Sequence, residues 1–195
     1  MDYIALMERF VAENEEERQT KRLLLDTCRA FPDTILTREN ELVHLTASGF
    51  VMDPALQRVL MVHHNIYNSW SWTGGHCDGD PDLLAVALRE VREETGLTRI
   101  EPQSGEPASL DILPVQGHWK RGRYVCPHLH LSAAFVLIAS REQPLREKPD
   151  ENSGVQWFDA AQIPQVCAEP QMIPVYARIL RRARRLGGVT PIDIF

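Results

Sequence analysis

The 195-residue sequence lacks the patterns that mark several large classes of protein. No apolar run approaches the ~20 residues needed to span a membrane, and the polar, acidic first turns are unlike a signal peptide. The formal net charge of −6 argues against a broad surface for a nucleic-acid polymer. We therefore expect a cytoplasmic protein that has neither a membrane nor a nucleic-acid polymer as its partner.

The chain is also poor in cysteine, and its cysteines show neither metal-binding nor disulfide spacing. The four, Cys28, Cys77, Cys126 and Cys167, are scattered along the sequence without a CxxC pair. This spacing excludes a zinc knuckle and a framework of disulfides. The sequence contains no internal repeat and no low-complexity segment. Its length fits one domain with an extension, and it suffices to bury a hydrophobic core.

Hydrophobic periodicity predicts helices at both ends of the chain and strands between them. Residues 2–31 carry two apolar stripes at helical spacing, separated by the acidic stretch 13–17, which indicates two helices or one bent helix. Residues 82–95 and 173–186 have the pattern of further helices. Strands interrupted by helices favour an α/β fold with helices on the faces of a sheet. The expected strands cover residues 42–51, 58–62, 70–73, 109–116, 129–139 and 154–158.

The two end segments leave alternatives open. The N-terminal segment either caps the main domain or packs in a homodimer, and the sequence does not decide between them. The final helix carries a basic run, for which we favour a solvated face that complements the C-terminal end of the helix dipole. This run consists of Arg178, Arg181, Arg182, Arg184 and Arg185.

Three glutamates near the end of the helix over residues 82–95 form the most informative feature of the sequence. Glu90, Glu93 and Glu94 stand at i, i+3 and i+4, so they project from one face of the helix. Like charges at this spacing repel each other and destabilise an isolated helix. A bound cation would offset the repulsion, and hard divalent ions such as Mg²⁺ prefer carboxylate and phosphate oxygens. The cluster predicts a metal-dependent enzyme that acts on a small-molecule phosphate substrate.

The segment around these glutamates resembles the signature of the Nudix hydrolases. That signature is a glycine, five residues, a glutamate, seven residues, and then Arg-Glu-apolar-any-Glu-Glu-any-Gly-apolar. With Gly75 as the first glycine, every specified position from Arg89 to Leu97 matches. The early glutamate is replaced by Pro81, which stands between two aspartates. Because proline suits the first turn of a helix, this departure puts an auxiliary metal ligand in doubt more than the catalysis itself.

The resemblance implies a Nudix-like α/β/α sandwich with a mixed sheet, preceded by an N-terminal helical extension. We place the extension at residues 1–36 and the Nudix hydrolase domain at residues 37–195. The resemblance further implies hydrolysis of the diphosphate linkage in a nucleoside diphosphate derivative, with Mg²⁺ or Mn²⁺ as the cofactor. Physical chemistry agrees, since a metal ion between phosphate oxygens offsets developing charge and acidifies a bound water.

The same resemblance assigns roles within the motif. Glu93 and Glu94 are expected to be metal ligands, and Glu90 a further ligand or a base. Arg89 is expected to orient Glu93 through an i,i+4 ion pair. Gly75 and Gly96 would permit tight turns, and Gly75 would also lie against the substrate.

A glutamate outside the helix is a further candidate for catalysis. Glu151 lies just before the strand over residues 154–158, at about the place where some Nudix enzymes recruit a base from a loop. An exposed polar turn is the alternative explanation. Because loop carboxylates near the end of a sheet can reach a site, we expect Glu151→Gln to lower turnover while leaving metal affinity nearly intact.

Histidines supply candidates for binding the substrate. His128 and His130 fall on one face of a strand, where they either contact phosphate, join a second metal site, or hydrogen-bond at the edge of the cleft. We favour the last interpretation for His130. We keep His128 as a substrate-binding residue, together with His76, which follows the glycine pair of the motif.

Basic and aromatic residues offer further contacts for a nucleotide. Arg123 belongs, with Lys120 and Arg121, to a basic cluster in an expected loop, which either binds a substrate phosphate or is solvated. A nucleobase can stack on an aromatic ring, although aromatic residues more often pack in a core. The candidate rings are those of Tyr67, Trp70, Trp72, Trp119 and Tyr124.

Two other functions compete with hydrolysis. An isopentenyl diphosphate isomerase-like enzyme shares the scaffold, and residues 44–47 and 72–76 faintly resemble two of its segments. That enzyme requires a cysteine at the position of Gly74, so an acid for proton transfer at carbon is not evident here. A non-catalytic nucleotide-ligand sensor on the same scaffold would tolerate degraded glutamates, whereas all three are intact. Hydrolysis is therefore preferred, and the identity of the substrate stays open.

Overall fold

The computed structural model of the protein describes residues 2–120 and 122–189. Its helices are α1 (Tyr3–Arg9), α2 (Glu15–Ala30), α3 (Leu83–Thr95), α4 (Ile163–Val166) and α5 (Ile173–Leu186), with short 3₁₀ turns at Ala160–Gln162 and Pro170–Met172. Its strands are β1 (Val43–Met52), β2 (Arg58–His64), β3 (Ser69–Ser71), β4 (Thr73–His76), β5 (Glu101–Pro102), β6 (Ser109–Val115), β7 (His118–Lys120), β8 (Arg123–Val125), β9 (His128–Ile138) and β10 (Asn152–Asp159).

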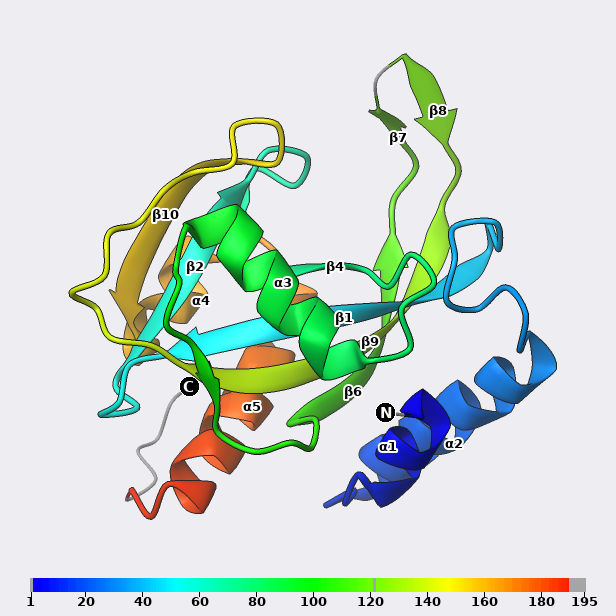
Figure 1. Ribbon diagram of the computed structural model, residues 1–195, viewed down its shortest axis with the longest axis horizontal. Helices are drawn as coiled ribbons and strands as arrows, with labels where there is room; N and C mark the ends of the chain where they lie inside the picture. The colour runs from blue at the N-terminus through cyan, green and yellow to red at the C-terminus, as the bar shows by residue number, and fades with distance from the viewer. Residues whose placement is uncertain (1, 121, 190–195) are drawn as a thin grey trace.

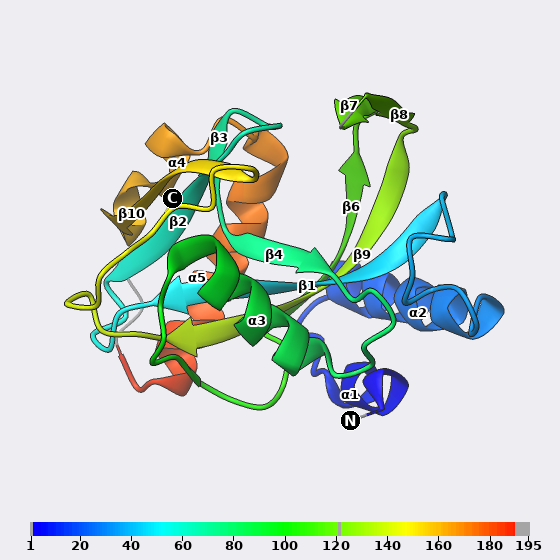
Figure 2. The same cartoon turned by 45° about the horizontal axis from the view of Figure 1, so that its top comes forward.

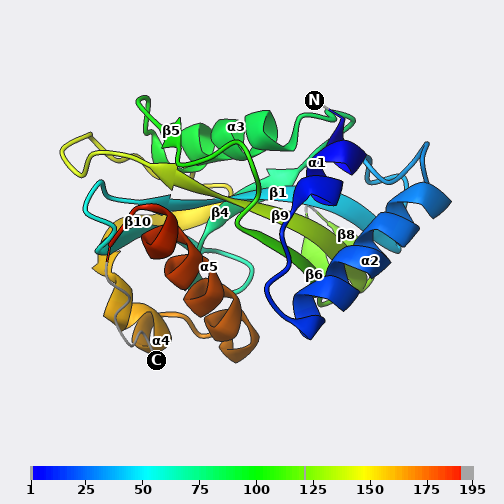
Figure 3. The same cartoon turned by 90° about the horizontal axis from the view of Figure 1, so that it is seen from below.

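Strand β1 lies at the centre of the fold and is buried along its whole length. Side chains alternate between the two faces of a strand. Leu45, Ala47 and Val51 therefore enter a core that includes α3, whereas Phe50 and Met52 enter a second core that includes α5. Figure 3 shows α3 and α5 on opposite sides of the sheet. The expected α/β/α sandwich is confirmed.

The main sheet is mixed, as expected. β1 runs parallel to β9 in continuous register, whereas β2 and β4 pair with β1 in the antiparallel direction. The strand order is β10-β2-β1-β9-β5, with β3 on β2, β4 on β1 and β6 on β9 (Figure 1). The single strand expected over residues 70–73 is two strands, because the chain changes its partner from β2 to β1 at Trp72.

Helix α3 is capped at both ends. The side chain of Asp82 accepts a hydrogen bond from the backbone N–H of Ala85. Gly96 ends the helix in the left-handed conformation at φ +76°, which favours glycine. Pro81 precedes the cap instead of lying in the first helical turn, because Asp82 takes the capping position.

The N-terminal segment forms two helices that pack on the core shared by α3 and β1. Leu6, Met7 and Leu24 are among its buried side chains. Two helices are one of the two expected alternatives, and the acidic stretch runs from the connection at Glu13 into the first turn of α2. Asn14 caps α2 and the three glutamates after it form its first turn, since negative charge is favoured at a helix N-terminus. In Figures 2 and 3, α1 and α2 lie beside the sheet, so the segment caps the main domain.

The basic run of α5 is partly buried, and the solvated face that we expected is wrong for three of its members. Arg182 is 6% exposed and donates to both carboxylate oxygens of Glu17, itself 2% exposed, at 3.1 and 2.9 Å. Arg178 contacts Asp111 and Glu17. Arg184 is buried and donates to a backbone carbonyl. Carboxylates far away in the sequence therefore pair with Arg178 and Arg182, and a distant backbone carbonyl accepts a hydrogen bond from Arg184.

A small hairpin, β7–β8, stands away from the main sheet (Figure 1). Lys120 and Arg123, which we expected in a loop, lie instead on its paired strands. Arg121 falls outside the described residues. Both strands are too short to show a hydrophobic alternation in the sequence, which is why they were missed. Within the described part of the chain, no helix is long and apolar enough to cross a membrane.

Candidate active site

Three carboxylates meet beside the C-terminal half of α3. Glu90, Glu94 and Glu151 each offer an oxygen, and these oxygens lie within 4.8 Å of one another. Glu90 and Glu94 stand one turn apart on α3, and Glu151 comes from the turn before β10. The side-chain amide of Asn152 donates to the backbone carbonyl of Glu94 at 3.0 Å, which fastens this turn to the helix. The structure thus brings the loop glutamate to the motif.

Glu94 is the buried member of this group, with 3% of its surface exposed. Its Oε1 accepts a hydrogen bond of 3.0 Å from the backbone N–H of Gly74 on β4. Burial raises the pKa of Glu94 to about 8, and the negative charges of Glu151 and Glu90 add to the effect. Burial also raises the pKa of Glu90, followed by the charge of Glu93. The arrangement strongly favours a positive charge between these side chains.

Glu93 lies apart from this group in the structure. Its Oε2 forms an ion pair of 3.0 Å with Nζ of Lys148, and the same Nζ lies 3.0 Å from Oε2 of Glu151. Hydrogen bonds and ion pairs with these two glutamates raise the pKa of Lys148 although burial opposes them. Lys148 was missed in the sequence analysis, because its contact with α3 joins residues that are far apart in the chain.

Arg89 does not form the expected ion pair with Glu93. Its guanidinium lies 3.6 Å from a carboxylate oxygen of Asp80 and 3.3 Å from Oε1 of Glu90. It also donates to the backbone carbonyl of His76 at 3.4 Å. The expectation was wrong because Lys148 pairs with Glu93, and Arg89 turns towards the loop before α3. Arg89 therefore orients the carboxylate of Glu90, and the ion pair with Asp80 holds the guanidinium of Arg89 in place.

Gly75 allows β4 to approach α3 closely, and this differs from the tight turn that we expected. A Cβ at this position would lie 2.5 Å from the carboxyl carbon of Glu90. Gly96 does occupy a left-handed turn, so the expectation holds for that glycine. Gly75 thus leaves space for the side chain of Glu90.

Four histidines gather near the start of β1. Ring centroids of His44 lie 5.0, 4.9 and 5.0 Å from those of His76, His128 and His130. His128 and His130 share a face of β9, as expected, with 3.1 Å between their Nε2 atoms. His44 was not among the site residues expected from the sequence. The parallel register that sets it opposite His130 is not visible in a sequence.

The remaining candidates divide between core and surface. Trp70 and Trp72 pack against the core beneath α5. Trp119 is 73% exposed on the β7–β8 hairpin, opposite the half-exposed ring of Tyr124 at 5.6 Å, and Arg123 is exposed beside them. Cys77 is buried, and burial raises the pKa of its thiol to about 12.

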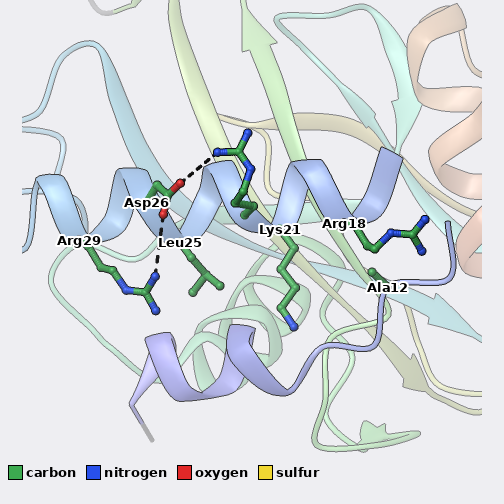
Figure 4. Close-up of a pocket in the computed structure, with 7 residues that line it drawn as sticks. Ala12, Arg18, Lys21, Leu25, Asp26 and Arg29 are labelled. Carbon is green, nitrogen blue, oxygen red and sulfur yellow. Dashed lines mark hydrogen bonds and ion pairs between the residues drawn. The ribbon is translucent and has the colours of Figure 1, made fainter. Parts of the chain in front are cut away.

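A hollow of about 420 Å³ lies on the N-terminal helices, and the carboxylates of α3 do not line it. Its lining includes the basic residues Arg22 and Arg29, and Figure 4 labels Arg18, Lys21 and Arg29 among them. Asp26 pairs with both at 3.2 and 3.9 Å, and Arg29 also pairs with Glu8. Since these cations already have carboxylate partners, the hollow is not the site to which the motif points.

Comparison with known proteins agrees with the fold and the motif. The sequence model of the NUDIX domain matches residues 42–182. The dihydroneopterin triphosphate pyrophosphohydrolase of E. coli is a similar solved structure, with a TM-score of 0.53 and 15% identity over 70% of this chain and 94% of that one. A C. elegans Ap4A hydrolase gives 0.49 and 15%, over 74% and 98%.

A NUDIX-family hydrolase from Clostridium perfringens gives a TM-score of 0.48 and 18% identity, over 70% of this chain and 95% of that one. No functionally curated protein matches the chain. The family model spans well over half of the sequence, including β1, α3 and β10. The chain therefore belongs to the Nudix family, whose hydrolases act on phosphorus-containing anhydrides.

Proposed function

We propose that this protein hydrolyses the diphosphate linkage of a nucleoside diphosphate derivative and uses Mg²⁺ or Mn²⁺. The observation that carries the proposal is the group of carboxylate oxygens from Glu90, Glu94 and Glu151 within 4.8 Å of one another. These are hard oxygen donors, which suit Mg²⁺ and Mn²⁺ better than softer ions. Burial and then the charges of Glu151 and Glu90 raise the pKa of Glu94, and a bound cation would offset these effects, which fits the same assignment.

In this proposal Glu90 and Glu94 hold the divalent ion, with Glu151 beside them. When bound, the ion offsets the charge of the phosphate oxygens and acidifies water. The N–H of Gly74 and the guanidinium of Arg89 fix the carboxylates of Glu94 and Glu90 respectively. Glu93 would join as a further ligand by exchanging its ion pair with Lys148 for the ion.

We assign the role of general base to Glu151. Lys148 lies 3.0 Å from its Oε2 and thereby fixes the orientation of the carboxylate. Oε1 then accepts a proton from water as the water oxygen bonds to phosphorus and the bond from that phosphorus to the bridging oxygen breaks, with the other phosphate as the leaving group. Placing the base on the loop and the ligands on α3 separates the two tasks between two elements of the fold.

The nucleotide part of the substrate is assigned from surface chemistry. The exposed rings of Trp119 and Tyr124 suit stacking of a nucleobase, and the exposed Arg123 suits a phosphate or ribose phosphate. The names of two similar structures describe hydrolases of dihydroneopterin triphosphate and of Ap4A. These names support a nucleotide derivative as the class of substrate. The expected contact of His76 and His128 with the substrate stays a prediction, and their rings lie with those of His44 and His130.

Isomerisation is disfavoured by two observations. Gly74 stands where the isomerase-like chemistry requires a thiol. The nearby Cys77 is 1% exposed, and its raised pKa opposes its use as a proton carrier. A purely ligand-binding role is distinguished from hydrolysis by product release.

The test is a screen of ADP-ribose, sugar nucleotides, dinucleoside polyphosphates, CoA and damaged nucleoside triphosphates with Mg²⁺ and with Mn²⁺. For a cleaved compound, Glu94→Gln should lower turnover at least about 100-fold, since even outer-shell partners of a metal typically contribute 10–100-fold. Glutamine resembles the protonated glutamate, so the fold should persist. Glu142→Gln, at an exposed surface carboxylate, is the matched control. Absence of cleavage across the screen, or full activity of Glu94→Gln, would contradict the proposal.

A further inference from the structure

The histidine cluster joins three strands of the sheet at one place. His44 comes from β1, His76 from the end of β4, and His128 and His130 from the start of β9. Besides the contacts of His44, the ring of His130 lies 5.1 Å from that of His76 and 5.0 Å from that of His128. Nitrogen atoms of His44, His76 and His130 all lie within 4.8 Å of one another.

The hydrogen bonds of this cluster leave a lone pair on Nε2 of His44 and on Nε2 of His128, the latter 3.1 Å from Nε2 of His130. Nδ1 of His44 lies 3.0 Å from the backbone carbonyl of Asn40, which only accepts, so this nitrogen carries the proton. Nε2 of His44 then carries a lone pair. This atom has no hydrogen-bond partner within residues 2–120 and 122–189, although the residue is only 4% exposed. A buried polar atom of this kind requires an explanation.

His128 repeats the same arrangement. Its Nδ1 lies 2.9 Å from the backbone carbonyl of Cys126, which leaves a lone pair on Nε2. A histidine that ligates a metal typically donates its other ring N–H to a carbonyl or carboxylate, which fixes the ring and the tautomer. Two of the four histidines therefore have the outer hydrogen bond that is usual for metal ligands.

The electrostatic setting favours neutral imidazoles. Burial lowers the pKa of His130 to about 2, and the neighbouring histidines add to the effect. Burial also lowers the pKa of His44. Neutral imidazole is the form that binds Zn²⁺ and other borderline ions.

We propose that His44, His76, His128 and His130 bind one borderline transition ion, of which Zn²⁺ is the type. With a Zn–N distance of about 2.0–2.1 Å, the edge of a tetrahedral site is about 3.3 Å. The Nε2 atoms of His128 and His130 are already 3.1 Å apart. Small side-chain rotations bring the other nitrogens to the same spacing, because they lie within 4.8 Å at present.

This site is separate from the carboxylates and differs from them in chemistry. On β4 the Cα of Gly75 faces Glu90 of α3. The next residue, His76, projects from the opposite face of the strand because side chains alternate. Oxygen donors select Mg²⁺ or Mn²⁺ on one face, and imidazoles select Zn²⁺, Co²⁺ or Ni²⁺ on the other. The two sites can therefore be filled independently.

The experiment measures bound metal, not activity. The full chain is freed of metals with a chelator, exchanged into buffer with excess Mg²⁺, and titrated with Zn²⁺ in equilibrium dialysis and with Co²⁺ by visible absorption. We expect dialysis to give one Zn²⁺ ion per chain. We expect the visible absorption of bound Co²⁺ to be that of an ion with nitrogen ligands. His44→Gln and His130→Gln should weaken Zn²⁺ binding at least about 100-fold.

Two controls make the result specific. His63→Gln removes a histidine that hydrogen-bonds Ser153 outside the cluster, and it should leave Zn²⁺ binding unchanged. Glu94→Gln should also leave Zn²⁺ binding unchanged while it impairs the Mg²⁺ site. Circular dichroism checks the fold, and His128→Gln, at a partly exposed position, replaces any buried variant that fails to fold.

Three outcomes would overturn the proposal. In the first, the wild type retains no Zn²⁺ in excess Mg²⁺. In the second, His63→Gln loses as much Zn²⁺ binding as His44→Gln and His130→Gln. In the third, Glu94→Gln loses Zn²⁺ binding and the histidine variants keep it. Binding of inorganic phosphate that disappears in His44→Gln, without any Zn²⁺ binding by the wild type, would show an anion site instead.

Discussion

Lys148 and Glu151 form an ion pair of 3.0 Å within the turn that reaches the carboxylates of α3. If Glu151 is the general base, Glu151→Gln should lower kcat by about 100-fold or more, the usual contribution of general acid–base catalysis. The Mg²⁺ concentration needed for half-maximal activity should shift less than it does in Glu94→Gln, because the ligands on α3 remain. The measurement is kcat at several Mg²⁺ concentrations.

The same loop provides the control for this prediction. Glu147→Gln removes an exposed carboxylate a few residues earlier and should behave as the wild type. If Glu151→Gln retains normal kcat, then Glu151 has no role in proton transfer. If its Mg²⁺ requirement rises as far as that of Glu94→Gln, then Glu151 is a ligand and not the base.

Gly75→Ala should impair the site without unfolding the protein. The new Cβ would lie 2.5 Å from the carboxyl carbon of Glu90 and would push this flexible side chain from its position. A displacement near 1 Å in an active site can lower the rate by about 100-fold. Gly105→Ala is the matched control, since a Cβ there meets open space. Unchanged kcat in Gly75→Ala with an unchanged melting temperature would remove close packing as the reason for this glycine.

Glu13 should give the fold a pH-dependent contribution. Hydrogen bonds from Arg185 and Arg182 lower its pKa to about 2 from an ordinary value of 4.5. A lowered pKa in the folded state stabilises the fold above pH 4.5, and this contribution is lost as the pH falls from 4.5 to about 2. Because the side chain is 37% exposed and screened by solvent, we expect only about 1 kcal/mol.

The measurement for Glu13 is urea unfolding of Glu13→Gln and wild type between pH 7 and pH 2. The difference in free energy of unfolding should be largest at neutral pH and vanish on acidification. Glu39→Gln, at an exposed carboxylate before β1, should show no such trend. A constant difference across the pH range would mean that packing, not charge, is lost in the variant.

Trp119→Ala should raise KM for a nucleotide substrate and leave kcat nearly unchanged. Stacking of a base on an aromatic ring contributes about 1–3 kcal/mol, which corresponds to a KM at least about 5-fold higher. Ile66→Ala, at another exposed apolar side chain, is the control. If KM is equal in both variants and in the wild type, the hairpin does not bind the base.

Long periodic elements could be predicted from the sequence because their local signals agree with their environment. α5 spans the expected residues, and α3 lies within the expected range 82–95, between its caps Asp82 and Gly96. The glutamates of α3 were identified because their spacing is local. Each of these features depends on residues within a few positions of one another.

Contacts between distant segments could not be predicted in this way. The pairing of Glu93 with Lys148, which replaces the expected pair with Arg89, depends on where the loop before β10 returns. The opposition of His44 and His130 depends on the parallel register of β1 and β9. A sequence gives the face of a strand on which a side chain lies, but not the neighbour that it meets.

The buried pair of Glu17 and Arg182 sets an order of events during synthesis. The two residues are 165 positions apart in the chain. At about 5–20 residues per second, a ribosome needs on the order of ten seconds to reach the arginine after it has added the glutamate. Through that interval the carboxylate of Glu17 on α2 is without its buried cation. Helix α2 therefore completes its packing only after α5 has been made.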